Sequence, residues 1–202
     1  MYQLRDPMPS LGRMMAFIDG ENLVARYQAM LVGGRKPYDH IAYQRDVLVW
    51  LPGVIWPGLN VVLRATYYTY VIGNEEVVAA TSTMIRKLTF VQYSVPGQSA
   101  TSRLINTLTP RVFAKPKNRS GKGVDIQMTV DILSNIYQNN VDTVFIVSGD
   151  GDYEPVFSEC RRMGKQVFLA ALSSGLSPKL PLLADHFMDL DGQFFYPADT
   201  PD

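Results

Sequence analysis

The segment Phe145–Tyr153, with the sequence FIVSGDGDY, constrains the fold of this chain more than any other. An apolar run of strand length ends in small residues and two carboxylates, and a helix-like stretch follows. In α/β proteins this pattern is typical of a buried parallel strand, whose carboxyl end lies at the sheet edge where ligands bind. The sequence therefore predicts a parallel sheet with polar chemistry at that edge.

Two further junctions place acidic residues in similar positions. Ala16–Asn22 (AFIDGEN) reads as a strand ending in Asp19, and Lys122–Asp125 (KGVD) opens a predicted helix. Because parallel strands end at a common sheet edge, the three acidic clusters are expected to meet there. Their convergence would make a site for a divalent metal ion.

Hydrophobic periodicity predicts strands that alternate with helices. The expected strands are 14–18, 60–71, 89–95, 111–115, 143–147, 166–171 and 186–190. A turn at 19–22 leads into a helix that ends at about residue 31, and further helices are expected at about 38–50, 75–87, 124–137, 153–163 and 177–183. The segment from Gln98 to Pro110 has no clear period. This alternation predicts an α/β fold, a three-layer α/β/α sandwich with a mostly parallel, Rossmann-like central sheet. No Gly-x-Gly-x-x-Gly follows the first strand, which disfavours a dinucleotide site.

Length and composition fit one domain that spans residues 1–202, with a core at about 14–190. At 202 residues and 47% hydrophobic, the chain can bury a substantial core. No apolar run approaches the ~20 residues needed to cross a bilayer, and residues 1–14 carry charges and no apolar signal core. With one cysteine, a reducing compartment fits. We expect a cytoplasmic protein.

The formal net charge of zero conceals a strong segregation of charge. The stretch from Val77 to Val124 contains no acidic residue. Its cations are Arg86, Lys87, Arg103, Arg111, Lys115, Lys117, Arg119 and Lys122. A basic ridge beside an acidic pocket suits a phosphate-bearing polymer whose scissile bond must reach metal ions. The alternative, a solvated loop that is basic by chance, stays open.

The aspartates carry the expected chemistry, because several uncompensated carboxylates within a few ångströms repel one another. A hard cation such as Mg²⁺ or Mn²⁺ removes that conflict and prefers oxygen ligands. One ion with waters, or two ions, would bind a phosphodiester and activate a water. The expected ligands, directly or through water, are Asp19, Asp125, Asp150 and Asp152.

Other polar residues near these junctions are candidates for substrate contact. Asn22 and Ser148 are expected to orient an acid or contact phosphate, and Lys122 to contact substrate phosphate, with Lys115, Lys117 and Arg119 from the basic ridge. Taken singly, each has a plainer interpretation: an aspartate after a strand is often a helix cap, and Lys122 also fits a solvated loop lysine.

At these residues the chain resembles the NYN domain family, a branch of the PIN-like nucleases. The matching pieces are FIDGEN at residues 17–22, KGVDIQMTVD at 122–131 and SGDGDY at 148–153. The resemblance implies a PIN-like α/β/α sandwich with a Mg²⁺- or Mn²⁺-dependent ribonuclease site. The family's acidic residues then fall on Asp19, Asp125, Asp150 and Asp152, and its asparagine on Asn22.

Three functions are compatible with these observations. The first is a metal-dependent endoribonuclease that acts on single-stranded or structured RNA. The second is a catalytically silent RNA-binding or regulatory module on a nuclease-like fold, and the third is a metal phosphohydrolase acting on nucleotides or DNA. A homodimer through the aromatic-rich segment from Trp50 to Trp56 is an open alternative to a monomer.

Overall fold

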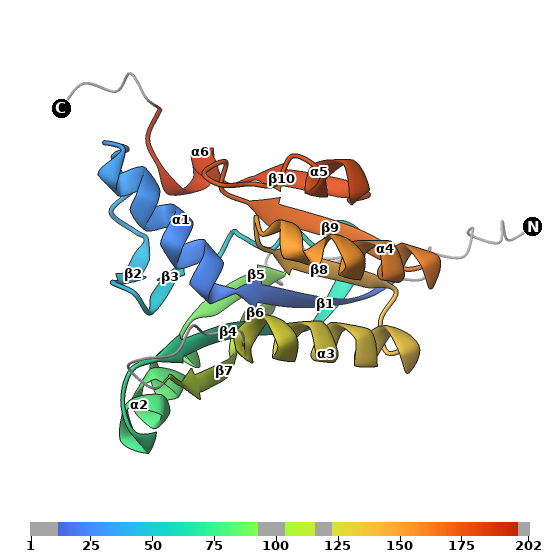
Figure 1. Cartoon of the computed structure of the whole chain (residues 1–202), viewed down its shortest axis with the longest axis horizontal. Helices are drawn as coiled ribbons and strands as arrows, with labels where there is room; N and C mark the ends of the chain where they lie inside the picture. Colours follow the sequence, from blue (N-terminus) through green and yellow to red (C-terminus); the bar gives the residue numbers. More distant parts are fainter. Residues whose placement is uncertain (1–11, 93–103, 116–122, 198–202) are drawn as a thin grey trace, which may run out of the picture.

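A computed structural model describes residues 12–92, 104–115 and 123–197. Its centre is a six-stranded sheet in the order β10-β9-β8-β1-β4-β7, in which every neighbouring pair is parallel (Figure 1). The strands are β1 (Gly12–Asp19), β4 (Asn60–Val71), β7 (Thr109–Ala114), β8 (Thr143–Val147), β9 (Gln166–Ala171) and β10 (His186–Asp189). The chain therefore has the predicted parallel sheet.

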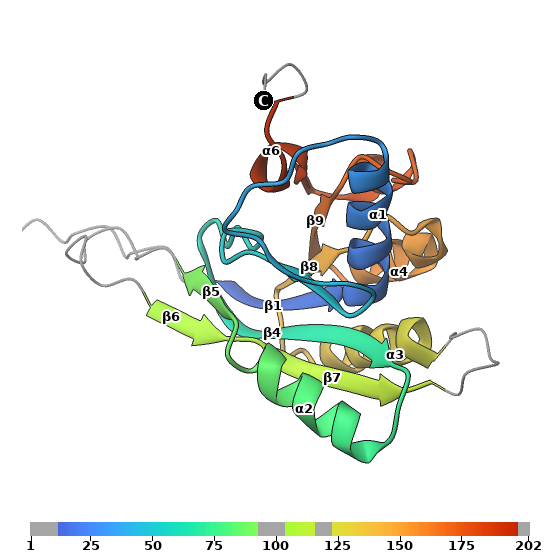
Figure 2. The same ribbon diagram turned by 90° about the vertical axis from the view of Figure 1, so that its left-hand side faces the viewer.

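Helices cover both faces of this sheet (Figure 2). One face carries α1 (Gly20–Val32), α2 (Glu75–Ile85) and α6 (Asp191–Phe194), and the other carries α3 (Gly123–Tyr137), α4 (Glu154–Arg162) and α5 (Leu180–Leu183). Side chains of β1 alternate between the two cores, with Ile18 in one and Phe17 in the other. The three-layer α/β/α prediction is confirmed. In the part of the chain that the structure describes, no helix combines the length and apolarity needed to span a membrane.

The order of the strands reverses between β1 and β8, and the region at the carboxyl ends of these two strands, where open α/β sheets have their binding crevice, is called the crevice below. From β1 the chain moves through β4 to β7, and α3 then returns it to β8 on the other side of β1. The helices that follow β1 and β8, α1 and α4, pack on opposite faces. Ligands of open α/β sheets bind at such a reversal of strand order. The fold therefore places the ends of β1 and β8 where a ligand site is expected.

The prediction of a helix at residues 38–50 is wrong. This segment forms a hairpin of β2 (Ala42–Gln44) and β3 (Leu48–Trp50), with Asp46 in the turn at a φ of 59°. All three residues of β3 are buried, and the Trp50 indole donates a hydrogen bond to the Thr89 carbonyl. Three consecutive buried side chains do not fit one face of a helix, so tertiary burial overrides the helical pattern here.

The same burial bears on the segment proposed for dimerisation. Trp50, Leu51, Val54 and Ile55 belong to the chain's own core, and Trp56 is 40% exposed. Most of this aromatic-rich segment is therefore already packed, and the homodimer stays a prediction.

Several other helices and strands have the predicted type but begin or end at different residues. Residues 151–153 form a 3₁₀ turn before α4, and α5 is limited to four residues. The structure adds α6, and it pairs β5 (Thr89–Gln92) with β6 (Leu104–Thr107) in the segment that lacked a clear period. Residues 93–95 of the expected strand lie outside the described residues.

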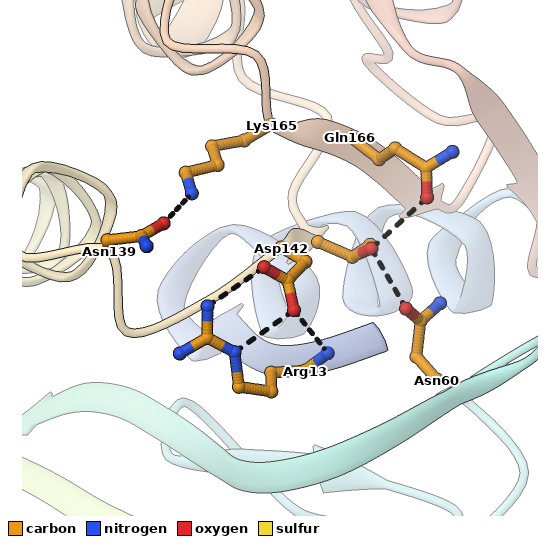
Figure 3. A network of polar contacts seen from close by, with 7 residues as sticks. Arg13, Asn60, Asn139, Asp142, Lys165 and Gln166 are labelled. Atoms are coloured by element: carbon orange, nitrogen blue, oxygen red, sulfur yellow. Dashed lines mark hydrogen bonds and ion pairs between the residues drawn. The ribbon is translucent and has the colours of Figure 1, made fainter. Parts of the chain in front are cut away.

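Polar contacts hold the amino ends of four strands together, at the edge opposite the crevice (Figure 3). Asp142 accepts hydrogen bonds from the Arg13 backbone N–H at 2.8 Å and from its guanidinium at 2.9 and 3.0 Å. The Thr143 hydroxyl lies 3.1 Å from Asn60 Oδ1 and 3.2 Å from Gln166 Oε1. These contacts join β1, β4, β8 and β9 and fix their relative register.

We predict that Asp142→Asn lowers the melting temperature at neutral pH by about 2 °C, because the ion pair is half exposed and screened by solvent. The hydrogen bonds from Arg13 lower the pKa of Asp142 from 3.8 to about 2. The carboxylate's contribution is thus present above pH 3.8 and is lost as the pH falls through about 2. Thermal melts of both proteins across this range should converge in acid. Asp39→Asn, at an exposed position, is the control, and a constant difference between parent and Asp142→Asn at every pH would contradict the prediction.

Candidate active site

Asp19 occupies the centre of the crevice. It is the last residue of β1 and the N-cap of α1, and its side chain is 1% exposed. Oδ1 accepts a hydrogen bond from the Asn22 N–H at 3.0 Å, and Oδ2 accepts one from the Ser148 hydroxyl at 3.0 Å. The next residue must be glycine, because a Cβ on Gly20 would lie 2.2 Å from the Tyr67 ring. The local sequence Asp-Gly therefore lets a carboxylate be buried where strand and helix meet.

The loop after β8 is tied to this carboxylate. The Ser148 hydroxyl donates to Asp19 and accepts from the Asp150 N–H at 3.1 Å, and its side chain is buried. The Asn22 side-chain oxygen accepts from the Gly149 N–H at 3.0 Å. Of the two roles predicted for Asn22 and Ser148, these contacts favour orientation of the acidic residues. They hold the ends of β1 and β8 in one arrangement.

The charge of Asp19 lacks a neutralising partner among the described residues, where it forms no ion pair. Burial, together with the negative charges of Asp125 and Glu21, raises its pKa from 3.8 to about 7. Asp125 lies in the first turn of α3, where the Tyr153 hydroxyl is 3.4 Å from its Oδ1. Strand β1 and helices α1 and α3 thus bring together the carboxylates of Asp19, Glu21 and Asp125 within electrostatic reach.

Asp150 and Asp152 lie beside this group. Asp150 caps the 3₁₀ turn, accepting from the Asp152 N–H at 3.0 Å, and its charge acts on buried Tyr153. Asp152 is exposed, and its carboxylate forms no hydrogen bond or ion pair with another described residue. Asp150 is therefore joined to Asp19 through Ser148, whereas Asp152 is placed at the rim.

Lys115 lies on the other side of the crevice, directly after β7. Its ammonium donates to the Tyr70 hydroxyl, and Tyr70 in turn donates to the carboxylate of Glu21. Burial raises the pKa of Glu21, and the charge of Lys115 opposes that rise. The structure thus places Lys115 at the edge of the acidic group. The other predicted cations, Lys117, Arg119 and Lys122, lie outside the described residues.

Asp131, which the motif at 122–131 includes, has a different environment. It accepts hydrogen bonds from the Tyr68 hydroxyl at 2.8 Å and the Gln127 amide at 2.9 Å, and Arg111 lies 3.7 Å away. These contacts fasten α3 to β4 and β7. Asp131 is therefore a packing residue that indirectly positions Asp125 on the same helix.

Sequence reasoning missed three residues of the site as partners of the acids: Glu21, Tyr70 and Tyr153. Glu21 adjoins the recognised Asp19-Gly20 turn, and Tyr153 closes the SGDGDY motif. Tyr70 belongs to the tyrosine-rich strand β4. The signal that identifies it is its position one residue before the end of β4, which brings it to the same sheet edge as Asp19.

The residues present fit a divalent cation in charge and in ligand type. Asp19 is a buried carboxylate without a cationic partner in the described part of the chain, beside two more carboxylates, and hard cations prefer such oxygen donors. As the side chains stand, no three His, Cys, Asp or Glu residues among those described form a group that could hold an ion. The metal ligands predicted from sequence therefore stay a prediction.

We predict that Asp19→Asn stabilises the protein in chelator at pH 8. The raised pKa means that the folded protein retains a proton between pH 3.8 and about 7 that the unfolded chain releases. The stability of the folded protein therefore falls as pH rises through this interval, and above it the destabilisation caused by the buried charge is fully present. The asparagine side chain would still offer an oxygen to the Asn22 N–H and would carry no charge. Thermal melts at pH 5 and pH 8 should show an advantage for the variant that grows with pH; a variant less stable than the parent at pH 8 would contradict this account.

Comparisons with known proteins agree with the fold and the motifs. The model of the NYN domain matches residues 13–191. An uncharacterized protein of Methanocaldococcus jannaschii is 30% identical over 97 residues, which cover 48% of this chain and 40% of that protein. The match thus spans about two fifths of the relative's length. A crystal structure of a Vibrio parahaemolyticus protein of unknown function has a TM-score of 0.51 at 16% identity, covering 95% of this chain and all of that one. The family match covers most of the chain and contains every motif of the crevice, so the protein belongs to the NYN domain family.

Proposed function

We propose that this protein is a metal-dependent endoribonuclease that hydrolyses phosphodiester bonds at the crevice between β1 and β8. The observation that supports this most directly is the buried, uncompensated carboxylate of Asp19 beside Asp125 and Glu21. Burial of a charge without a partner is costly, and proteins accept such a cost mainly at functional sites. Membership of the NYN family, a nuclease-like domain, adds to this argument.

In this proposal Asp19, Asp125, Asp150 and Asp152 hold Mg²⁺ or Mn²⁺, directly or through water. When bound, the ion would lower the pKa of a water molecule and offset the charge of the phosphodiester. Ser148 orients Asp19, and Asn22 fixes the Gly149 backbone, so the ligands of β1 and β8 keep one relative position. Lys115, with the basic residues Lys117, Arg119 and Lys122 that follow it, would attract the RNA backbone.

Two other functions are weighed against this one. A silent RNA-binding module would use the same basic residues without turnover, and a phosphohydrolase acting on nucleotides or DNA would use the same acids. The raised pKa of Asp19 favours a catalytic site over a surface that only binds RNA, because strongly shifted pKa values cluster at catalytic sites. We also propose that the protein acts in the cytoplasm.

We predict that the parent cleaves labelled single-stranded RNA in Mn²⁺ and that Asp150→Asn slows cleavage by at least about 100-fold, since it removes a negative charge beside the ion. The melting temperature of Asp150→Asn should stay near the parent's, because an asparagine oxygen can still accept from the Asp152 N–H. The measurement is single-turnover cleavage on a denaturing gel, with EDTA as the metal-free condition.

Asp39→Asn is the matched control, since it removes an exposed carboxylate on a loop. Cleavage by Asp150→Asn at the parent's rate would place the activity elsewhere or in a contaminant. RNA binding that survives EDTA, with no cleavage in any metal, would support the silent module instead. Duplex DNA and free nucleotides in the same assay separate the third function.

A further inference from the structure

Arg26 lies on α1 one turn after Asn22, on the side of the helix that faces the ends of β8 and β9. Its guanidinium packs against Gly175 in the loop that follows β9: a Cβ built on Gly175 would lie 2.3 Å from Nη1 and 2.7 Å from Nε. Gly175 has a φ of +66°, a conformation that favours glycine. The loop therefore leaves room for this arginine where another residue would displace it.

The same loop contacts the candidate active site. The Ser177 N–H donates to the Gly149 carbonyl at 2.9 Å, and a Cβ on Gly149 would lie 3.2 Å from Leu176 and 3.5 Å from the Gly175 carbonyl oxygen. Gly175 thus lies between the guanidinium of Arg26 and the Gly149-Asp150 junction. Arg26 is consequently fixed beside the carboxylate site, across the crevice from Lys115.

No charged partner occupies this guanidinium in the part of the chain that the structure describes. Nε of Arg26 is buried and without a hydrogen-bond acceptor, and the side chain forms no ion pair with a described residue. Nε of Arg35, further along the chain, is likewise buried and has no acceptor among the described residues, but its Nη1 lies 3.6 Å from Asp191 and its Nη2 donates to the Tyr196 carbonyl at 3.3 Å. The two Nη groups of Arg26 form no hydrogen bond with a described residue and are not among the buried atoms without a partner. They are therefore the donors that an anionic group on a ligand would contact, while the buried Nε keeps the guanidinium packed against the loop.

We propose that Arg26 and the loop at residues 173–177 form a phosphate-binding subsite for the RNA strand, on the β8 and β9 side of the scissile bond. This inference rests on the proposed function and extends it. A guanidinium suits a phosphate because its planar donors match two phosphate oxygens at once. With Lys115 on the opposite side, the strand would cross the crevice between two cations, with the carboxylates beneath the bond to be cleaved.

Equilibrium binding of a fluorescent oligouridylate of about 12 nucleotides, a length that one binding groove covers, tests this subsite by anisotropy. The titration is run in EDTA at several KCl concentrations, so cleavage does not contribute. Arg26→Gln should weaken binding about tenfold at low salt. It should also make the dependence of log K on log salt shallower by about 0.7, the value for one lost phosphate contact on a single strand. Arg26→Lys should retain most of the slope.

Arg161→Gln removes an exposed arginine at the end of α4 and is the control for net charge. An Arg26→Gln variant with the parent's affinity and slope would overturn the subsite. The subsite would also be overturned if Arg26→Gln and Arg26→Lys both lost affinity by the same factor and both kept the parent's salt slope. That result would mean that Arg26 acts through packing and not through contact with a phosphate. A parent that binds but never cleaves in Mn²⁺ would overturn the proposed function alone. A parent that binds no RNA would overturn both.

Discussion

The burial of one negative charge at the end of β1 is the constraint on which the functional architecture depends. Asp19 is held by the first turn of α1 and by Ser148 at the end of β8, in a place that water scarcely reaches. Those two contacts stabilise the ionised form only in part, and its pKa stays at about 7. The fold therefore carries a carboxylate that is expensive in the free protein and becomes favourable when a cation binds.

The two edges of the sheet differ in how their charged side chains are paired. At the amino edge, the Asp142 carboxylate is matched by the guanidinium of Arg13, and the contacts there are mutually satisfied. At the carboxyl edge, Asp19 has no cationic partner and Arg26 has no anionic one among the described residues. One edge stabilises the strand register, and the other retains unsatisfied groups, which the proposed function assigns to a ligand. Natural proteins concentrate such local conflicts at functional sites.

Much of the fold follows from periodicity, because β4, β8 and β9 occupy the residues that their apolar runs indicate. The hairpin of β2 and β3 does not, since its residues satisfy a helical pattern and only their common burial decides against it. The segment that contains β6 pairs with β5 in a two-stranded sheet separate from the six-stranded one.

The residues of the candidate site also fall into a group that the sequence indicates and a group that it does not. Asp19, Asn22, Ser148 and Asp150 are linked by hydrogen bonds, and each lies at or near a strand end that the sequence reveals. Tyr70 and Arg26 are placed by register and by loop packing, which depend on residues far away in the chain. The position of Tyr70 near the end of a predicted strand places it at the sheet edge, but its partner Glu21 depends on the strand order, and sequence spacing carries no signal for the loop contact of Arg26.

The central claim, that acids from β1, α3 and the β8 loop converge on one cation, is tested most directly by the anomalous scattering of Mn²⁺ in crystals of the protein. The account predicts a peak at about 2.1 Å from a carboxylate oxygen of Asp19, a distance typical of a small hard cation, with Asp125 and Asp150 reaching the same ion directly or through water. A Mn²⁺ peak elsewhere, with Asp19 still bonded only to Asn22 and Ser148, would contradict it.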